Sequence, residues 1–169
     1  MARHKENSID VVNVRLVKEP SIYAADPIKT PEDVLNAVAN ELKQYDREVF
    51  AIINLKTSGQ IINLNICSVG TLNSSLISPR EVFKSSILSN AAAFIAIHNH
   101  PSGNCQPSEE DKTTTERLMK CGEILDIRML DHIIVAGETG EMLSMKKEGM
   151  MPDPHAREPQ NHWAAADLR

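Results

Sequence analysis

The sequence has few cysteines and no long apolar run. Its three cysteines, Cys67, Cys105 and Cys121, form no C-x-x-C pair, which argues against a secreted disulfide framework and against a thiolate zinc cluster. The most apolar run, Ala91 to Ile97, is far shorter than the ~20 residues that cross a membrane. The N-terminal segment MARHKENSID also lacks the apolar core of a signal peptide. We therefore expect a cytoplasmic protein with no membrane span.

Positive charge is also scarce. The 18 Lys and Arg side chains are outnumbered by 23 Asp and Glu, and the formal net charge is -5. A broad cationic face for nucleic acid is therefore not expected, although a local basic patch is compatible with this balance. A chain of 169 residues is long enough to bury a core without disulfides or a structural metal. Any bound metal is therefore expected to take part in a reaction and not to stabilise the fold.

Patterns along the chain predict helices and strands in alternation. We expect helices over 30–42, from 78 onward and over 108–125, and strands over 11–18, 48–56, 60–69, 91–98, 127–135 and 141–145. Ser78-Pro79-Arg80-Glu81 has the pattern of a capping box at the start of the second helix. This order predicts an α/β or α+β fold with a mixed sheet flanked by helices.

Composition divides the chain into three parts. An N-terminal strand and loose segment are expected at 1–28, one domain at 29–148 and a flexible tail at 149–169. The tail is rich in proline and has no hydrophobic periodicity, which is typical of segments that do not pack.

The informative stretch surrounds two histidines that follow an apolar run. His98 and His100 stand at positions i and i+2 near the end of a predicted strand, so both imidazoles project to the same side. If Ser108 caps the next helix, Asp111 lies in its first turn and can supply a carboxylate. Two imidazoles and one carboxylate are a set that zinc accepts, and three protein ligands leave the fourth position open for catalysis.

Each of these features alone has a structural interpretation. A buried histidine is more often a satisfied core residue than a ligand, and Ser-x-x-Asp is explained equally well by helix capping. Together, however, His98, His100 and Asp111 have no obvious packing rationale. Asp131-His132 is interpreted as a structural hydrogen-bonded pair on a strand, in the second shell of a metal at most. Cys105 stands within the loop from Pro101 to Pro107 and could contact an ion, but its lone placement favours accidental proximity.

The spacing of these residues resembles a known signature. An upstream glutamate, H-x-H, seven residues and S-x-x-D form the JAMM motif of the JAB/MPN metalloprotease superfamily, and the seven-residue spacing from Pro101 to Pro107 is kept here. The flanking segments are similar to the RadC family: GTLN at 70–73, PREVF at 79–83, NAAA at 90–93, HNHPSG at 98–103 and LDHIIV at 130–135. The resemblance covers about Thr30 to Lys146 and implies the JAB/MPN, cytidine-deaminase-like fold.

The resemblance also implies a role for each motif residue. His98, His100 and Asp111 would bind zinc, and Ser108 would stabilise the charge that develops on the substrate oxygen. The glutamate that acts as general acid and base stands at the start of an early strand, which points to Glu48. Glu81 is the rival, although the capping box and its place in a helix account for it.

Two functions compete at this stage. The first is a zinc-dependent metallopeptidase or isopeptidase-like hydrolase that cleaves an amide bond in a peptide or protein. The alternative is a DNA-linked role without peptidase activity, because RadC proteins are traditionally labelled as repair proteins. The helix-hairpin-helix region usual in the family does not fit before the first helix, so we expect a JAB-domain-only member similar to forms on mobile elements. A metal-stabilised interaction module is a third possibility, and neither the substrate nor the oligomeric state is indicated.

Overall fold

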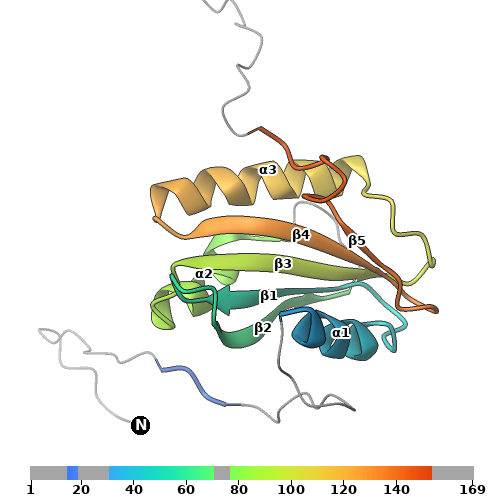
Figure 1. The fold of residues 1–169 in the computed structure, drawn as a ribbon, viewed down its shortest axis with the longest axis horizontal. Helices are drawn as coiled ribbons and strands as arrows, with labels where there is room; N and C mark the ends of the chain where they lie inside the picture. The colour runs from blue at the N-terminus through green and yellow to red at the C-terminus, as the bar shows by residue number, and fades with distance from the viewer. Residues whose placement is uncertain (1–14, 19–30, 71–76, 154–169) are drawn as a thin grey trace, which may run out of the picture.

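The computed structural model describes residues 15–18, 31–70 and 77–153 (Figure 1). Its helices are α1 (Pro31–Leu42), α2 (Pro79–Leu88) and α3 (Glu109–Ile124). Its strands are β1 (Val49–Leu55), β2 (Ile61–Val69), β3 (Ala93–His100), β4 (Arg128–Ala136) and β5 (Met142–Ser144). In Figure 1, α3 runs beside β4 at the top of the view and α1 lies at the bottom.

The strands of the described residues form one mixed sheet in the order β2-β1-β3-β4-β5. β3 and β4 are parallel, and the other neighbouring pairs are antiparallel. The parallel pair is connected through α3, whereas the antiparallel hairpin β1–β2 turns at Gly59, which has a positive φ of 81°. This helix-flanked mixed sheet is the α+β architecture expected from the sequence and is consistent with the JAB/MPN fold.

The sheet carries a hydrophobic layer on each face. The layer under α1 contains Val38, Leu42, Val49, Ala51, Ile53, Ile97, Ile133 and Val135, and the layer under α2 and α3 contains Phe50, Ile52, Val82, Phe83, Phe94, Ala96, Leu118 and Met129. All seven residues of β1 are buried, because this strand has a sheet neighbour on each side and helices over both faces. Alternation along β3 directs Phe94, Ala96 and therefore His98 towards α3.

Helices α2 and α3 both end in a Schellman motif. In α3 the amide of Ile127 donates to the carbonyl of Gly122 at 2.9 Å, and the amide of Asp126 donates to Glu123 at 3.3 Å. Asp126 takes the left-handed conformation that this motif requires, with φ 56°. The motif returns the chain from α3 into β4.

Several expected boundaries change in the structure. The third strand runs to His100 instead of ending at position 98, because its parallel pairing with β4 continues to Ala136. Residues 15–18 form no strand, and Val17 is 80% exposed; none of the strands that the structure describes pairs with this segment. Positions 11–14 of that expected strand lie outside the described residues.

The capping box expected at the start of α2 is not formed. Ser78 is the N-cap residue, but its side chain makes no capping hydrogen bond. Glu81 instead pairs with Lys84 at 2.6 Å on the exposed surface of the helix. The proline at the first helical position has no N–H, so fewer amides need a cap.

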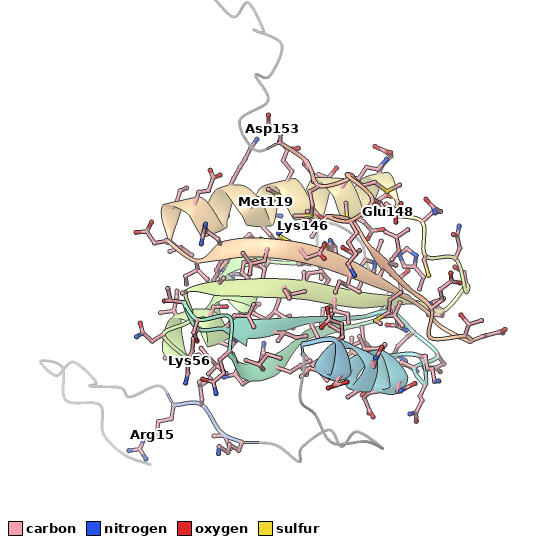
Figure 2. The ribbon with its side chains drawn as sticks, viewed as in Figure 1. Arg15, Lys56, Met119, Lys146, Glu148 and Asp153 are labelled. Carbon is pink, nitrogen blue, oxygen red and sulfur yellow. The ribbon has the colours of Figure 1, made fainter. Side chains whose placement is uncertain are left out.

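The first residues of the expected tail are packed. The amide of Met150 donates to the carbonyl of Met145 at 2.7 Å, and Met151 contacts the hydrophobic layer under α2 and α3. Figure 2 shows Asp153 on the same side of the molecule as α3, on which Met119 is labelled. Residues 154–169 lie outside the described part. Among the described helices, none has the length and apolar character needed to cross a bilayer.

Candidate metal centre

Three side chains that can bind metal converge where β3 meets the start of α3. His98 Nε2 lies 2.9 Å from His100 Nε2 and 3.1 Å from one carboxylate oxygen of Asp111. The other oxygen of Asp111 lies 3.3 Å from His100 Nε2. His98 is fully buried and Asp111 is 6% exposed, whereas His100 is partly open to solvent. The potential ligand atoms of all three lie within 4.8 Å of one another.

Ser108 holds the carboxylate of Asp111 in place through a complete capping box. Both the amide and the hydroxyl of Ser108 donate to Asp111 Oδ2 at 2.7 Å, and the amide of Asp111 donates back to the hydroxyl at 3.1 Å. The expected cap at Ser108 is therefore present. It occupies both donors of Ser108, so the hydroxyl must turn away from Asp111 before it can reach any other acceptor.

His98 is oriented from behind by a buried chain of hydrogen bonds. The hydroxyl of Thr115 donates to the carbonyl of Asp111 at 2.6 Å, one helical turn earlier. A hydroxyl has a single proton, so towards His132 Nδ1, 2.6 Å away, Thr115 can act only as acceptor. The proton of His132 is therefore on Nδ1. The sulfur of Met145, 3.8 Å from the same hydroxyl, is too weak an acceptor to compete with the carbonyl.

The tautomer of His98 follows from this chain. Complete burial lowers the pKa of His132 well below its usual value and keeps the ring neutral. Its Nε2 then carries a lone pair and accepts from His98 Nδ1–H at 2.8 Å. In a neutral His98 the Nε2 then carries the lone pair, and this lone pair faces His100 and Asp111. Phe50 packs against both rings, stacked on His98 at 6.1 Å and edge-on to His132 at 5.6 Å between centroids.

The loop that follows His100 orients its ring in the same way, with the Nδ1 proton bound and Nε2 directed at the other two side chains. Its Nδ1 donates to the carbonyl of Asn104 at 2.7 Å. Neutral His100 therefore also directs an Nε2 lone pair at the shared space. With both rings neutral, two nitrogen lone pairs and a carboxylate face one another, an arrangement that a positive charge between the groups, a proton or a metal ion, stabilises. This donor set, N, N and O, fits a divalent metal ion.

The electrostatics of the group agree with this geometry. The hydrogen bond to Asp111 raises the pKa of His100, despite its burial. Burial alone would raise the pKa of Asp111, but the imidazoles of His100 and His98 hold that pKa well below its usual value. Both pKa shifts thus favour a positive charge on the imidazole side and a negative charge on the carboxylate.

Glu48 lies beside this group, at the start of β1. Continuing the pairing of Phe50 with His98 places Glu48 opposite His100, and the charge of Glu48 contributes to the raised pKa of His100. Glu81 instead pairs with Lys84 on the exposed surface of α2. Of the two candidate glutamates, only Glu48 is therefore brought to the histidines.

A buried asparagine fixes the backbone around Glu48. The side-chain carbonyl of Asn99 accepts from the amide of Val49 at 2.7 Å, and its NH₂ group donates to the carbonyl of Arg47 at 3.1 Å. Asn99 is fully buried. The side-chain amide of Asn99 thus makes two hydrogen bonds to the backbone of the preceding and following neighbours of Glu48, in the way that a backbone group of a paired strand would.

Sequence reasoning missed or misjudged several of these residues. Asp131 and His132 are hydrogen-bonded as expected, but through the backbone amide of His132, and the carboxylate of Asp131 also accepts from Ser144. The ring of His132 lies behind the candidate ligand His98, in the second shell that the sequence allowed at most, and it also bonds to Thr115. Thr115 and Asn99 were not singled out. A signal exists for both, because a threonine one turn after Asp111 and a polar residue inside an apolar strand need buried partners. Cys105 lies outside the group, and its thiol donates to the carbonyl of Glu141.

A separate apolar cavity lies between α2 and α3. Its volume is about 560 Å³, and it is lined by Pro79, Arg80, Phe83, Lys84, Ile87, Leu88, Cys121, Ile124 and Leu125. None of the residues of the metal group contributes to it. The cavity is therefore a separate feature from the histidine cluster.

Comparison with known proteins gives the family context. The family model described as "RadC-like JAB domain" matches residues 28–150. The chain is similar to UPF0758 proteins of Desulforamulus reducens and Moorella thermoacetica, each 44% identical over 124 residues, and to UPF0758 protein YsxA of Bacillus subtilis, 40% identical over 124 residues. These matches cover 73% of this chain and 53–54% of each relative. The chain thus spans about half the length of the curated relatives it matches.

Proposed function

Since the chain belongs to the family of RadC-like JAB domains, we propose that it is a zinc-dependent hydrolase that cleaves an amide bond in a peptide or protein. The observation that carries this proposal is the convergence of His98, His100 and Asp111, whose potential ligand atoms all lie within 4.8 Å of one another. Glu48 at the edge of that space adds a carboxylate that is not needed to fill the ligand set. A ligand set with a neighbouring acid–base group favours hydrolysis over a purely structural metal.

The protein would hold the ion through three side chains on rigid elements. His98 and His100 supply Nε2 from β3, and Asp111 supplies its carboxylate from the first turn of α3. When bound, zinc polarises a carbonyl group and lowers the pKa of water, with one position left open for the reactants. The partial exposure of His100 favours approach of the substrate from its side of the group.

Glu48 would move the proton. Its carboxylate accepts a proton from the attacking water and delivers it to the nitrogen of the leaving amine. The hydrogen bonds of Asn99 to Val49 and Arg47 hold the backbone of Glu48 at the edge of the histidine cluster. Ser108 would donate to the substrate oxygen after its hydroxyl turns away from Asp111 Oδ2.

The test uses zinc-loaded protein and a peptide library that includes isopeptide-linked substrates. We expect Glu48→Gln to retain stoichiometric zinc and to lose hydrolysis, because glutamine keeps the shape of the side chain but cannot accept the proton. Glu81→Gln is the matched control and should keep full activity. Full hydrolysis by Glu48→Gln would refute the assignment of the base, and a wild-type protein without stoichiometric zinc would refute the proposal itself.

A further inference from the structure

A chain of hydrogen bonds behind the metal group connects two of its candidate ligands, Asp111 and His98, by way of His132 on β4. The chain of hydrogen bonds starts at the backbone carbonyl of Asp111 on α3, passes through Thr115 and His132, and ends at Nδ1 of His98 on β3. Thr115, His132 and His98 are all fully buried. Water therefore does not compete for these bonds, and each proton position is determined by the next group along the chain.

We propose that Thr115 and His132 are positioning residues that fix His98 in its Nδ1–H tautomer and thereby prepare its Nε2 to bind the metal. The inference rests on the proposed metal site and deepens it. The direction of the chain is set at its start, because the carbonyl of Asp111 can only accept. Thr115 must donate to it, and the alternating donors and acceptors that follow leave His98 one tautomer.

The acceptor of the His98 Nδ1–H also affects the net charge of the metal group. Histidines that bind metals usually donate their second N–H to a carboxylate, a backbone carbonyl or water. Here the acceptor is a neutral imidazole, so the hydrogen-bond chain orients His98 without bringing a second negative charge to the site. Asp111 is then the one anionic group among the three side chains that converge, so these ligands would leave part of the charge of a divalent ion uncompensated towards Glu48 and the substrate.

Substitutions of similar size at the members of the hydrogen-bond chain test the proposal. Thr115→Val keeps the volume of the side chain but removes the hydroxyl, and Thr115→Ser restores a hydroxyl. His132→Phe keeps an aromatic ring against Phe50 and removes both ring nitrogens. Thr114→Val is the matched control, because Thr114 is the preceding residue of α3, is also buried at 7% exposure and is no member of the hydrogen-bond chain.

Two measurements are made on each folded variant. The first is zinc affinity, by competition with a chromophoric chelator. We expect Thr115→Val and His132→Phe to lose about 10–100-fold, the range for mutation of partners behind a ligand, and Thr115→Ser and Thr114→Val to stay near the wild type. The second is ¹⁵N NMR of the imidazoles in the metal-free protein. In the wild type His98 should carry its proton on Nδ1, and in Thr115→Val it should populate the Nε2–H form.

The outcomes separate this inference from the proposed function. Wild-type zinc binding together with unchanged affinity and an unchanged His98 tautomer in both Thr115→Val and His132→Phe would overturn the positioning role and leave the metal site standing. Equal losses in Thr115→Val and Thr114→Val would also overturn it, because they would indicate a general effect of altering the helix. Absence of zinc binding by the wild-type protein would overturn the proposed site and this inference with it.

Discussion

The Nε2 atoms of His98 and His100 lie 2.9 Å apart, although each imidazole already donates its other N–H, His98 to the buried His132 and His100 to the carbonyl of Asn104. Two neutral imidazoles in this arrangement would repel each other through their lone pairs. The close approach therefore requires either a proton or a metal ion between them, with Asp111 as the balancing charge. Several consequences of this relationship can be measured without knowledge of the substrate.

Zinc should stabilise the wild-type fold. A ligand that binds only the native state adds about 2.7 kcal/mol at a concentration 100 times its dissociation constant, and this gain should appear as a higher melting temperature. Asp111→Asn should abolish most of the zinc-dependent rise, because the amide is neutral. Glu109→Gln, an exposed change in the same helical turn, is the control and should respond to zinc like the wild type. An equal response of Asp111→Asn would exclude Asp111 as a ligand.

The metal-free protein should be most stable at mildly acidic pH. The raised pKa of His100 contributes stability that is fully present below about pH 6.5 and is lost as the pH rises through the folded value. The depressed pKa of Asp111 contributes stability above about pH 4 that is lost as the pH falls further. Urea unfolding with a chelator present should therefore give a maximum between these limits. In His100→Ala the decline on the alkaline side should be smaller, and an unchanged decline would contradict the assignment.

Local patterns predicted much of this fold because they depend on neighbours in sequence. The helix starting after Ser108, the hairpin of β1 and β2, and the common direction of His98 and His100 all follow from short periodicities or from spacings of two or three residues. The Ser108–Asp111 capping box is also local. These features needed no knowledge of how the elements pack.

The remaining features depend on register between distant segments. His132 reaches His98 only because β4 pairs in parallel with β3 with His98 opposite Ile134, and a slip of one residue would direct the ring to the other face of the sheet. Such a register is not determined by either strand alone. The capping box that does not form at Ser78 is the opposite case: the local pattern is present, but the carboxylate of Glu81 pairs with Lys84 instead.

Removal of the Asn99 side chain should destabilise the fold without removing the metal. Asn99→Ala leaves the amide of Val49 and the carbonyl of Arg47 without the partners they now have, and an unsatisfied buried group costs about 1–3 kcal/mol. We expect a loss in this range by urea unfolding, with stoichiometric zinc retained because Asn99 points to the face opposite His98 and His100. Asn36→Ala, on an exposed position of α1, should have little effect. Loss of zinc in Asn99→Ala at a temperature where it remains folded would refute this separation of roles.

Gly122 should be intolerant of a side chain although it lies in a helix. The Schellman motif that ends α3 brings the carbonyl of Ile127 against the Cα of Gly122, and an added Cβ would overlap that oxygen. Alanine is favoured over glycine in helices by about 1 kcal/mol, but overpacking against rigid backbone costs about 1–3 kcal/mol. Because the obstacle is backbone and not a flexible side chain, we expect Gly122→Ala to lower the free energy of unfolding.

The matched control for this substitution is Arg117→Ala, at an exposed position of the same helix. Its effect should stay within about 0.5 kcal/mol, so urea unfolding of the two variants separates close packing from helix propensity. The entry of the chain into β4 depends on this turn, and β4 carries His132. We therefore also expect weaker zinc binding by Gly122→Ala than by Arg117→Ala. If Gly122→Ala were more stable than the wild type, helix propensity would outweigh the contact with Ile127.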